Sequence, residues 1–133
     1  MNRKISILAG CLGLTAVILG AFGAHGLKEL LPPESLNTFE TGVRYQMYHS
    51  LLLLFIANSA YISTISKKLV FYLVSFGVLC FSGSIYGLAT NNLTTFDFKA
   101  VGFITPIGGF LLILAWGILI VDFIKSKSNF NSK

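Results

Sequence analysis

The sequence predicts an all-α integral membrane protein folded as an antiparallel four-helix bundle. Of its 133 residues, 54% are hydrophobic and only 11% are charged, whereas about 25% of a typical soluble domain is charged. The chain also contains four long uncharged runs, and each exceeds the roughly 20 residues that a helix needs to cross a bilayer. These runs cover residues 5–27, 45–66, 69–96 and 100–121.

The first helix is expected over about residues 4–27. Its start, with Arg3 and Lys4 before an apolar stretch and small residues near 20–24, also resembles a signal peptide. However, the uncharged run of 23 residues is long for the apolar region of such a peptide. Cleavage would also leave the next helix without a partner, so we expect this segment to be retained.

The second helix is expected over about residues 35–64, after the Pro32-Pro33 pair. The residue before a proline avoids helical backbone angles, whereas a proline is well tolerated in the first helical turn. A helix over 34–62 would be about 43 Å long, which exceeds a hydrocarbon core of roughly 30 Å. Its first two turns are therefore expected to project into the headgroup zone or beyond it.

The third and fourth helices are expected over about residues 68–91 and 98–125. The connections at 63–68 and 91–99 are short and polar, so each forces its neighbouring helices into an antiparallel hairpin. Residues 1–133 then form a single transmembrane domain. The two hairpins do not repeat one another in sequence, which weighs against an inverted-repeat transporter.

The basic residues predict the orientation in the membrane. Seven lie on the side of the N-terminus and three lie on the opposite side, which favours cytoplasmic N- and C-termini and an inner-membrane, multi-pass location. The first group is Arg3, Lys4, Lys67, Lys68, Lys125, Lys127 and Lys133; the second is Lys28, Arg44 and Lys99. The net charge of +5 does not indicate nucleic-acid binding, because no basic patch alternates with aromatic residues.

Small residues at helical spacing predict close helix packing. The residues are Gly13, Gly20, Gly83, Gly87 and Gly109, together with Pro106 in the fourth helix. Pro106 lacks a backbone N–H, which would free the carbonyl of Gly102 to face a cavity. The small residues suit packing within the chain, an interface between copies in a homo-oligomer, or both.

Polar residues converge on the outer half of the predicted bundle, where their cost in lipid makes them informative. This candidate ligand-binding cluster comprises His25, Glu40, Arg44, Tyr45, Tyr48, His49, Ser82, Ser84, Tyr86 and Thr105. The i,i+4 spacing of Glu40 and Arg44 suits an ion pair. A neutral His49 needs hydrogen-bond partners, for which Ser82, Ser84, Tyr86 and Thr105 are the candidates.

Each member of the cluster also has a simpler interpretation. Arg44 suits an interfacial anchor, His25 a helix cap, and the tyrosines an aromatic belt at the membrane surface. His49 suits either an interhelical contact or a functional proton or ligand contact. Trp116 is interpreted as lipid-facing or as core filler.

No cofactor or metal is expected. Two histidines with scattered carboxylates fall short of the four ligands of a closed metal site. Nucleotide-binding and haem-attachment motifs, and a serine nucleophile elbow, do not occur in the sequence.

Three functions remain open at the level of sequence. The first is binding or passage of a small ligand or lipid through the outer polar pocket by a non-enzymatic homo-oligomer. The second is an accessory or assembly subunit of a larger membrane complex. The third is a lipid- or quinone-acting enzyme in which His49 is the acid or base, Arg44 contacts a phosphate or headgroup and Tyr86 is a polar assistant.

Four motifs together resemble one family of small membrane proteins. They are GAFGAHG at 20–26, YQMYH at 45–49, FSGSIY at 81–86 and TPIGG at 105–109. In order and spacing they are similar to the domain-of-unknown-function family 423, and the resemblance covers nearly the whole chain. It implies four spans in an inner or organellar membrane, and it carries no established activity, cofactor or catalytic residue.

Overall fold

The computed structural model describes residues 1–130, with side chains as far as Ser126, and it is all-helical over this range. The all-α class is therefore confirmed. Lys133 and the Lys127 side chain, both part of the basic count, lie outside the described residues. The elements are α1 (Asn2–His25), α2 (Pro33–Asn58), α3 (Thr64–Ala89), the 3-10 turns η1 (Asn91–Leu93) and η2 (Phe98–Val101), and α4 (Ile104–Phe130).

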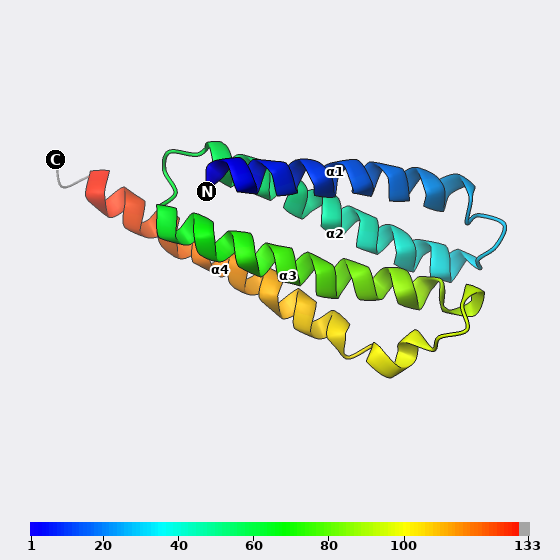
Figure 1. Cartoon of the computed structure of the whole chain (residues 1–133). Helices are drawn as coiled ribbons and strands as arrows, with labels where there is room; N and C mark the ends of the chain where they lie inside the picture. Colours follow the sequence, from blue (N-terminus) through cyan, green and yellow to red (C-terminus); the bar gives the residue numbers. More distant parts are fainter. Residues whose placement is uncertain (131–133) are drawn as a thin grey trace.

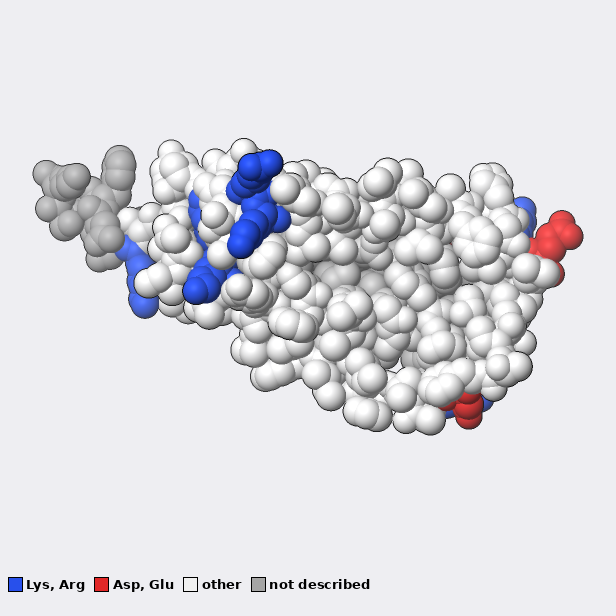
Figure 2. Space-filling model, viewed as in Figure 1, with Lys and Arg blue, Asp and Glu red and all other residues white. Residues whose placement is uncertain are grey.

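Successive helices alternate in direction and pack in chain order (Figure 1). α1 packs on α2, α2 on α3, and α3 on α4. The beginnings of α1 and α3 lie at one end of the molecule, and η1 and η2 lie at the other. Lys and Arg side chains gather at the first of these ends (Figure 2). We call it the basic end; its described members are Arg3, Lys4, Lys67, Lys68 and Lys125.

Among residues 1–130, three helical segments are long and apolar enough to cross a membrane: Asn2–His25, Thr64–Ala89 and Phe98–Ser126. α2 is not one of them. Polar residues such as Arg44, Gln46 and His49 lie within it and lower its mean hydropathy. An apolar half, with a run of leucines from Leu51 to Leu54, follows them toward the basic end.

Two apolar clusters form the core. The larger lies toward the basic end and includes Ile5, Leu53, Ile56, Val70 and Leu119. The smaller lies toward the far end and consists of Leu27, Leu31, Phe39 and Ala89. Between them on α2 and α3 lie four buried polar side chains, which we call the polar layer: Gln46, His49, Ser50 and Ser82.

Several helix boundaries differ from those expected. α3 begins at Thr64 rather than near 68, and α4 continues to Phe130 rather than ending near 125. Two larger shifts affect the end of α2 and the start of α4. α2 ends at Asn58 rather than near 64, because Ser59 adopts an extended conformation and residues 59–63 form the connection to α3. α4 begins at Ile104 rather than near 98. Asp97 instead caps η2 by accepting a hydrogen bond from the Lys99 amide.

Asp122 on α4 closes the connection between α2 and α3. Its carboxylate accepts hydrogen bonds from the Ser63 amide at 3.0 Å, the Ser63 hydroxyl at 2.8 Å and the Ser66 hydroxyl at 2.6 Å. A carboxylate is favourable at a helix N-terminus, where amide groups lack partners within the helix. This contact attaches α4 to the start of α3.

Candidate functional site

His49 is buried, with 4% of its surface exposed, and both of its ring nitrogens are engaged. Nδ1 lies 2.7 Å from the Tyr45 carbonyl and Nε2 lies 3.3 Å from the indole nitrogen of Trp116. A carbonyl can only accept and an indole N–H can only donate. Nδ1 therefore carries the proton, Nε2 accepts, and the imidazole is neutral in this arrangement.

These partners correct one expectation and add a contact to another. None of the four hydroxyl groups proposed for His49 bonds to it; its side-chain partner comes from α4 instead. Trp116, expected to be lipid-facing or filler, is 47% exposed yet donates this hydrogen bond. The neighbouring rings meet edge to face, with centroids 6.3 Å apart.

Gln46 joins three helices and was not among the predicted site residues. Its Nε2 donates to the Leu12 carbonyl at 2.9 Å and to the Thr15 hydroxyl at 2.7 Å, both on α1. Its Oε1 accepts from the Tyr86 hydroxyl on α3 at 2.6 Å. The amide thus uses both donor hydrogens and its acceptor. Its polar side chain within an expected membrane span is the sequence signal that could have indicated this role.

Hydroxyl groups make further hydrogen bonds between helices. Ser82 on α3 donates to the Gly42 carbonyl on α2 at 2.7 Å. Ser50 on α2 donates to the Ala9 carbonyl on α1 at 2.6 Å. Ser84 and Thr105 share a short hydrogen bond between α3 and α4. Each adjacent pair of helices is therefore joined by at least one hydroxyl.

Five predicted members lie on the surface of α2 or at the end of α1. Glu40 and Arg44 form an ion pair at 2.9 Å, and their side chains are 55% and 52% exposed. Tyr45 and Tyr48 are also exposed, with ring centroids 5.8 Å apart. His25, the last residue of α1, is exposed as well. The predicted cluster is thus divided between a buried layer and an exposed surface.

The predicted small residues differ in what they contact. A Cβ at Gly13 would lie 2.9 Å from the Ser50 hydroxyl, and one at Gly20 would lie 3.3 Å from Val43. Gly87 lies against the Phe98 ring and Gly109 against Phe81. A Cβ at Gly83 would meet no heavy atom of the described chain within 4 Å.

Among the glycines of the described chain, the tightest contact between helices occurs at Gly108. A Cβ at this position would overlap the backbone of Cys80 and Phe81 on α3. Pro106 lies in the first turn of α4, and the Gly102 carbonyl accepts from the Thr105 amide at 3.3 Å. The carbonyl expected to face a cavity therefore already has a partner.

The polar layer is closed within the chain. Among the described residues, every buried side-chain nitrogen or oxygen has a hydrogen-bond partner. No group of three or more His, Cys, Asp or Glu residues that could hold a metal ion occurs within residues 1–130. Chemically, the arrangement holds helices together through neutral hydrogen bonds.

Three apolar segments of spanning length and a polar layer joining the helices define a small helical membrane protein. The model of the family "Protein of unknown function (DUF423)" matches residues 19–109. The chain belongs to this family.

Curated relatives match along almost their whole length. A UPF0382 membrane protein of Staphylococcus saprophyticus is 41% identical, and the match covers 92% of this chain and 98% of the relative. YwdK of Bacillus subtilis, also named a UPF0382 membrane protein, is 39% identical over 92% of this chain and 98% of its own. One from Haemophilus influenzae is 38% identical over 96% and 99%. No solved structure matches the chain.

Proposed function

We propose that this membrane protein crosses the inner membrane four times as an antiparallel bundle and serves as an accessory or assembly subunit of a larger membrane complex. α2 packs against both α1 and α3, which are apolar segments of spanning length. A helix that packs along two membrane-spanning helices crosses the same bilayer. The excess of basic residues at the basic end supports cytoplasmic N- and C-termini.

The closed polar layer favours this role over ligand passage. A ligand site needs polar groups that are free to bind the ligand. Here Gln46 and His49 direct all their hydrogen-bonding groups to neighbouring residues. His49 likewise has no free nitrogen with which to exchange a proton with a substrate, so the enzyme hypothesis loses its acid or base.

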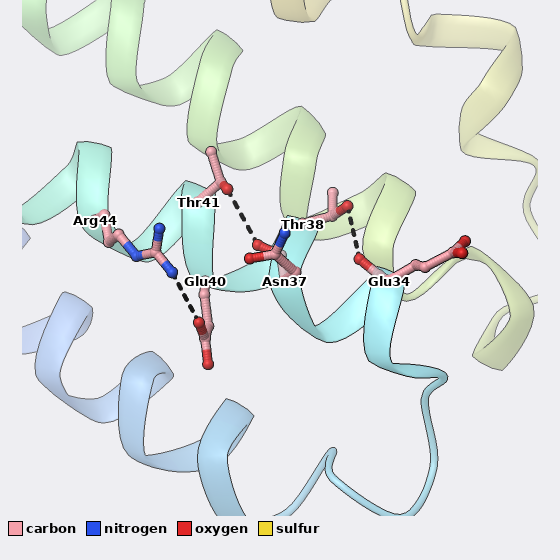
Figure 3. Close-up of polar contacts among 6 residues, drawn as sticks. All are labelled: Glu34, Asn37, Thr38, Glu40, Thr41 and Arg44. Atoms are coloured by element: carbon pink, nitrogen blue, oxygen red, sulfur yellow. Dashed lines mark hydrogen bonds and ion pairs between the residues drawn. The ribbon is translucent and has the colours of Figure 1, made fainter.

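One observation carries the accessory role: the outer half of α2 exposes a polar face. Figure 3 shows this α2 polar face, and all of the contacts drawn on it stay within the helix. Its members are Glu34, Asn37, Thr38, Glu40, Thr41 and Arg44.

The α2 polar face extends into the bilayer past the outer end of α3. The Gly42 carbonyl bonds to Ser82, which lies seven residues before the end of α3 at Ala89, a depth of about 10 Å. The Glu40–Arg44 pair on either side of Gly42 therefore lies level with Ser82, within the segment of α3 that is long and apolar enough to cross a membrane. Charged groups facing lipid are costly, so a polar surface of a partner would stabilise the assembly by covering them.

Site-specific photo-cross-linking in living cells tests this proposal. A photoreactive residue at exposed Thr38 should cross-link to one discrete protein. The same residue at Phe55, which is 55% exposed on the apolar half of α2, serves as the control and should give no discrete protein band. Replacement of Arg44 by Ala should weaken the Thr38 product.

The mass of the cross-linked product separates the alternatives. A product larger than the 14.5 kDa chain by the mass of a different protein supports an accessory subunit. A product of twice the chain mass would refute the accessory role and indicate a homo-oligomer instead. Absence of any discrete product at Thr38 would refute a protein partner at the α2 polar face.

A further inference from the structure

A surface groove runs between α3 and α4 near the basic end. Its volume is about 500 Å³. Six residues form its apolar part: Ile65, Leu69, Leu114, Gly117, Ile118 and Val121. A Cβ at Gly117 would meet no described heavy atom within 4 Å, so this glycine leaves open space beside the groove.

The groove becomes polar toward the basic end. Ser66, Asp122 and Lys125 line it there, and they also line an adjoining hollow of about 440 Å³ beside the α2–α3 connection. The Asp122 carboxylate is engaged by Ser63 and Ser66. Lys125 is exposed and has no carboxylate within 4.0 Å among the described side chains, so its ammonium is available to an anion.

The order of these surfaces matches an amphipathic molecule aligned with the helices. From Leu114 to Lys125, α4 advances 11 residues, or about 16 Å. The apolar wall thus leads along the membrane normal to a cation at the surface. A lipid presents its chain and headgroup in this same order.

Charge at the basic end specifies the headgroup. Its five described cations face one described carboxylate near the groove, Asp122, and Figure 2 shows basic side chains gathered there. Basic residues next to a span attract anionic lipids by about 1 kcal/mol each. A zwitterionic headgroup would gain less from this excess of positive charge.

We infer that the α3–α4 groove binds one acyl chain of an anionic phospholipid whose phosphate pairs with Lys125. This lipid site rests on the proposed membrane orientation and does not depend on the proposed partner protein. The α2 polar face lies on other residues, so the two proposals can fail separately.

Native mass spectrometry of the purified full-length chain tests the site, with phosphatidylglycerol and phosphatidylcholine of the same chain length added in turn. Wild-type protein should retain one phosphatidylglycerol at least tenfold more tightly than phosphatidylcholine. Gly117→Leu should fill the groove and weaken this binding about tenfold. Gly83→Leu is the matched control, because Gly83 also has open space around it and lies outside the groove.

A second pair of variants tests the headgroup contact. Lys125→Gln should reduce the preference for phosphatidylglycerol toward parity, whereas Lys99→Gln, which removes a cation near the far end, should leave it unchanged. Circular dichroism and elution volume confirm folding of each variant. Equal retention of the two lipids by wild type, or phosphatidylglycerol binding unaltered in both Gly117→Leu and Lys125→Gln, would overturn the inference.

Discussion

Replacing Gln46 with Leu should destabilise the bundle by about 2 kcal/mol. The side chain is 5% exposed and makes three hydrogen bonds to α1 and α3. In membrane proteins such bonds average about 0.6 kcal/mol each, with a maximum near 1.7. Leucine is close to glutamine in volume, so little of the loss should come from a cavity.

A double-mutant cycle with Tyr86→Phe isolates the bond between α2 and α3. In the wild-type background Tyr86→Phe removes the hydroxyl that donates to Gln46 Oε1, and it should cost about 0.6–1.7 kcal/mol. In the Gln46→Leu background that bond is already absent, so the same change should cost almost nothing or restore some stability. The coupling energy should therefore be about 0.6–1.7 kcal/mol.

Reversible unfolding by sodium dodecyl sulfate in mixed micelles measures these values. The single tryptophan of the chain, Trp116, supplies a fluorescence signal alongside circular dichroism. Ser75→Ala is the control, because among the described residues the Ser75 hydroxyl bonds only to the Phe71 carbonyl within α3. The change should stay within about 0.5 kcal/mol. An equal cost of Tyr86→Phe in both backgrounds would refute the proposed role of Gln46.

Further predictions concern other contacts. Gly108→Ala should destabilise the chain by about 1–3 kcal/mol, because its methyl group overlaps the α3 backbone; Gly117→Ala, with open space, should be neutral or stabilising by up to about 1 kcal/mol in the same unfolding assay. Nitrogen NMR should find His49 neutral with its proton on Nδ1, and Trp116→Phe should shift the Nε2 resonance; a proton on Nε2 in the wild type would contradict the assigned hydrogen bonds. Asp122→Asn should speed amide hydrogen exchange at the start of α3, since it removes the charge that accepts three hydrogen bonds there; unchanged exchange would show that the contact does not stabilise this helix end.

The sequence predicted the helices well because apolar runs and polar breaks determine where a chain can cross a membrane. It overestimated α2 because Ala60, Tyr61 and Ile62 continue the apolar run without a proline or glycine. In the structure the break begins at Ser59, which is extended, and it ends at Ser63, which caps α3 and bonds to Asp122, 59 residues away. A contact of that range leaves no local pattern in the sequence.

The site was harder to predict than the helices because a helix that is apolar all round does not reveal which face it buries. α4 is such a helix, so nothing in its pattern directed Trp116 toward His49. Of the polar residues selected on α2 and α3, His49 and Ser82 are buried in the polar layer. Their partners depend on helix rotation, and several of those partners are backbone carbonyls that have no signature in the sequence.

These carbonyl acceptors have a consequence for how the chain tolerates change. Ser50 and Gln46 recognise the backbone of α1 at Ala9 and Leu12, and Ser82 recognises that of α2 at Gly42. Every amino acid supplies such a carbonyl, so the accepting helix can exchange lipid-facing side chains while keeping the same register. Information about helix alignment is therefore concentrated in a few donor side chains, and the surface that meets lipid or a partner is free to diverge around a fixed interior.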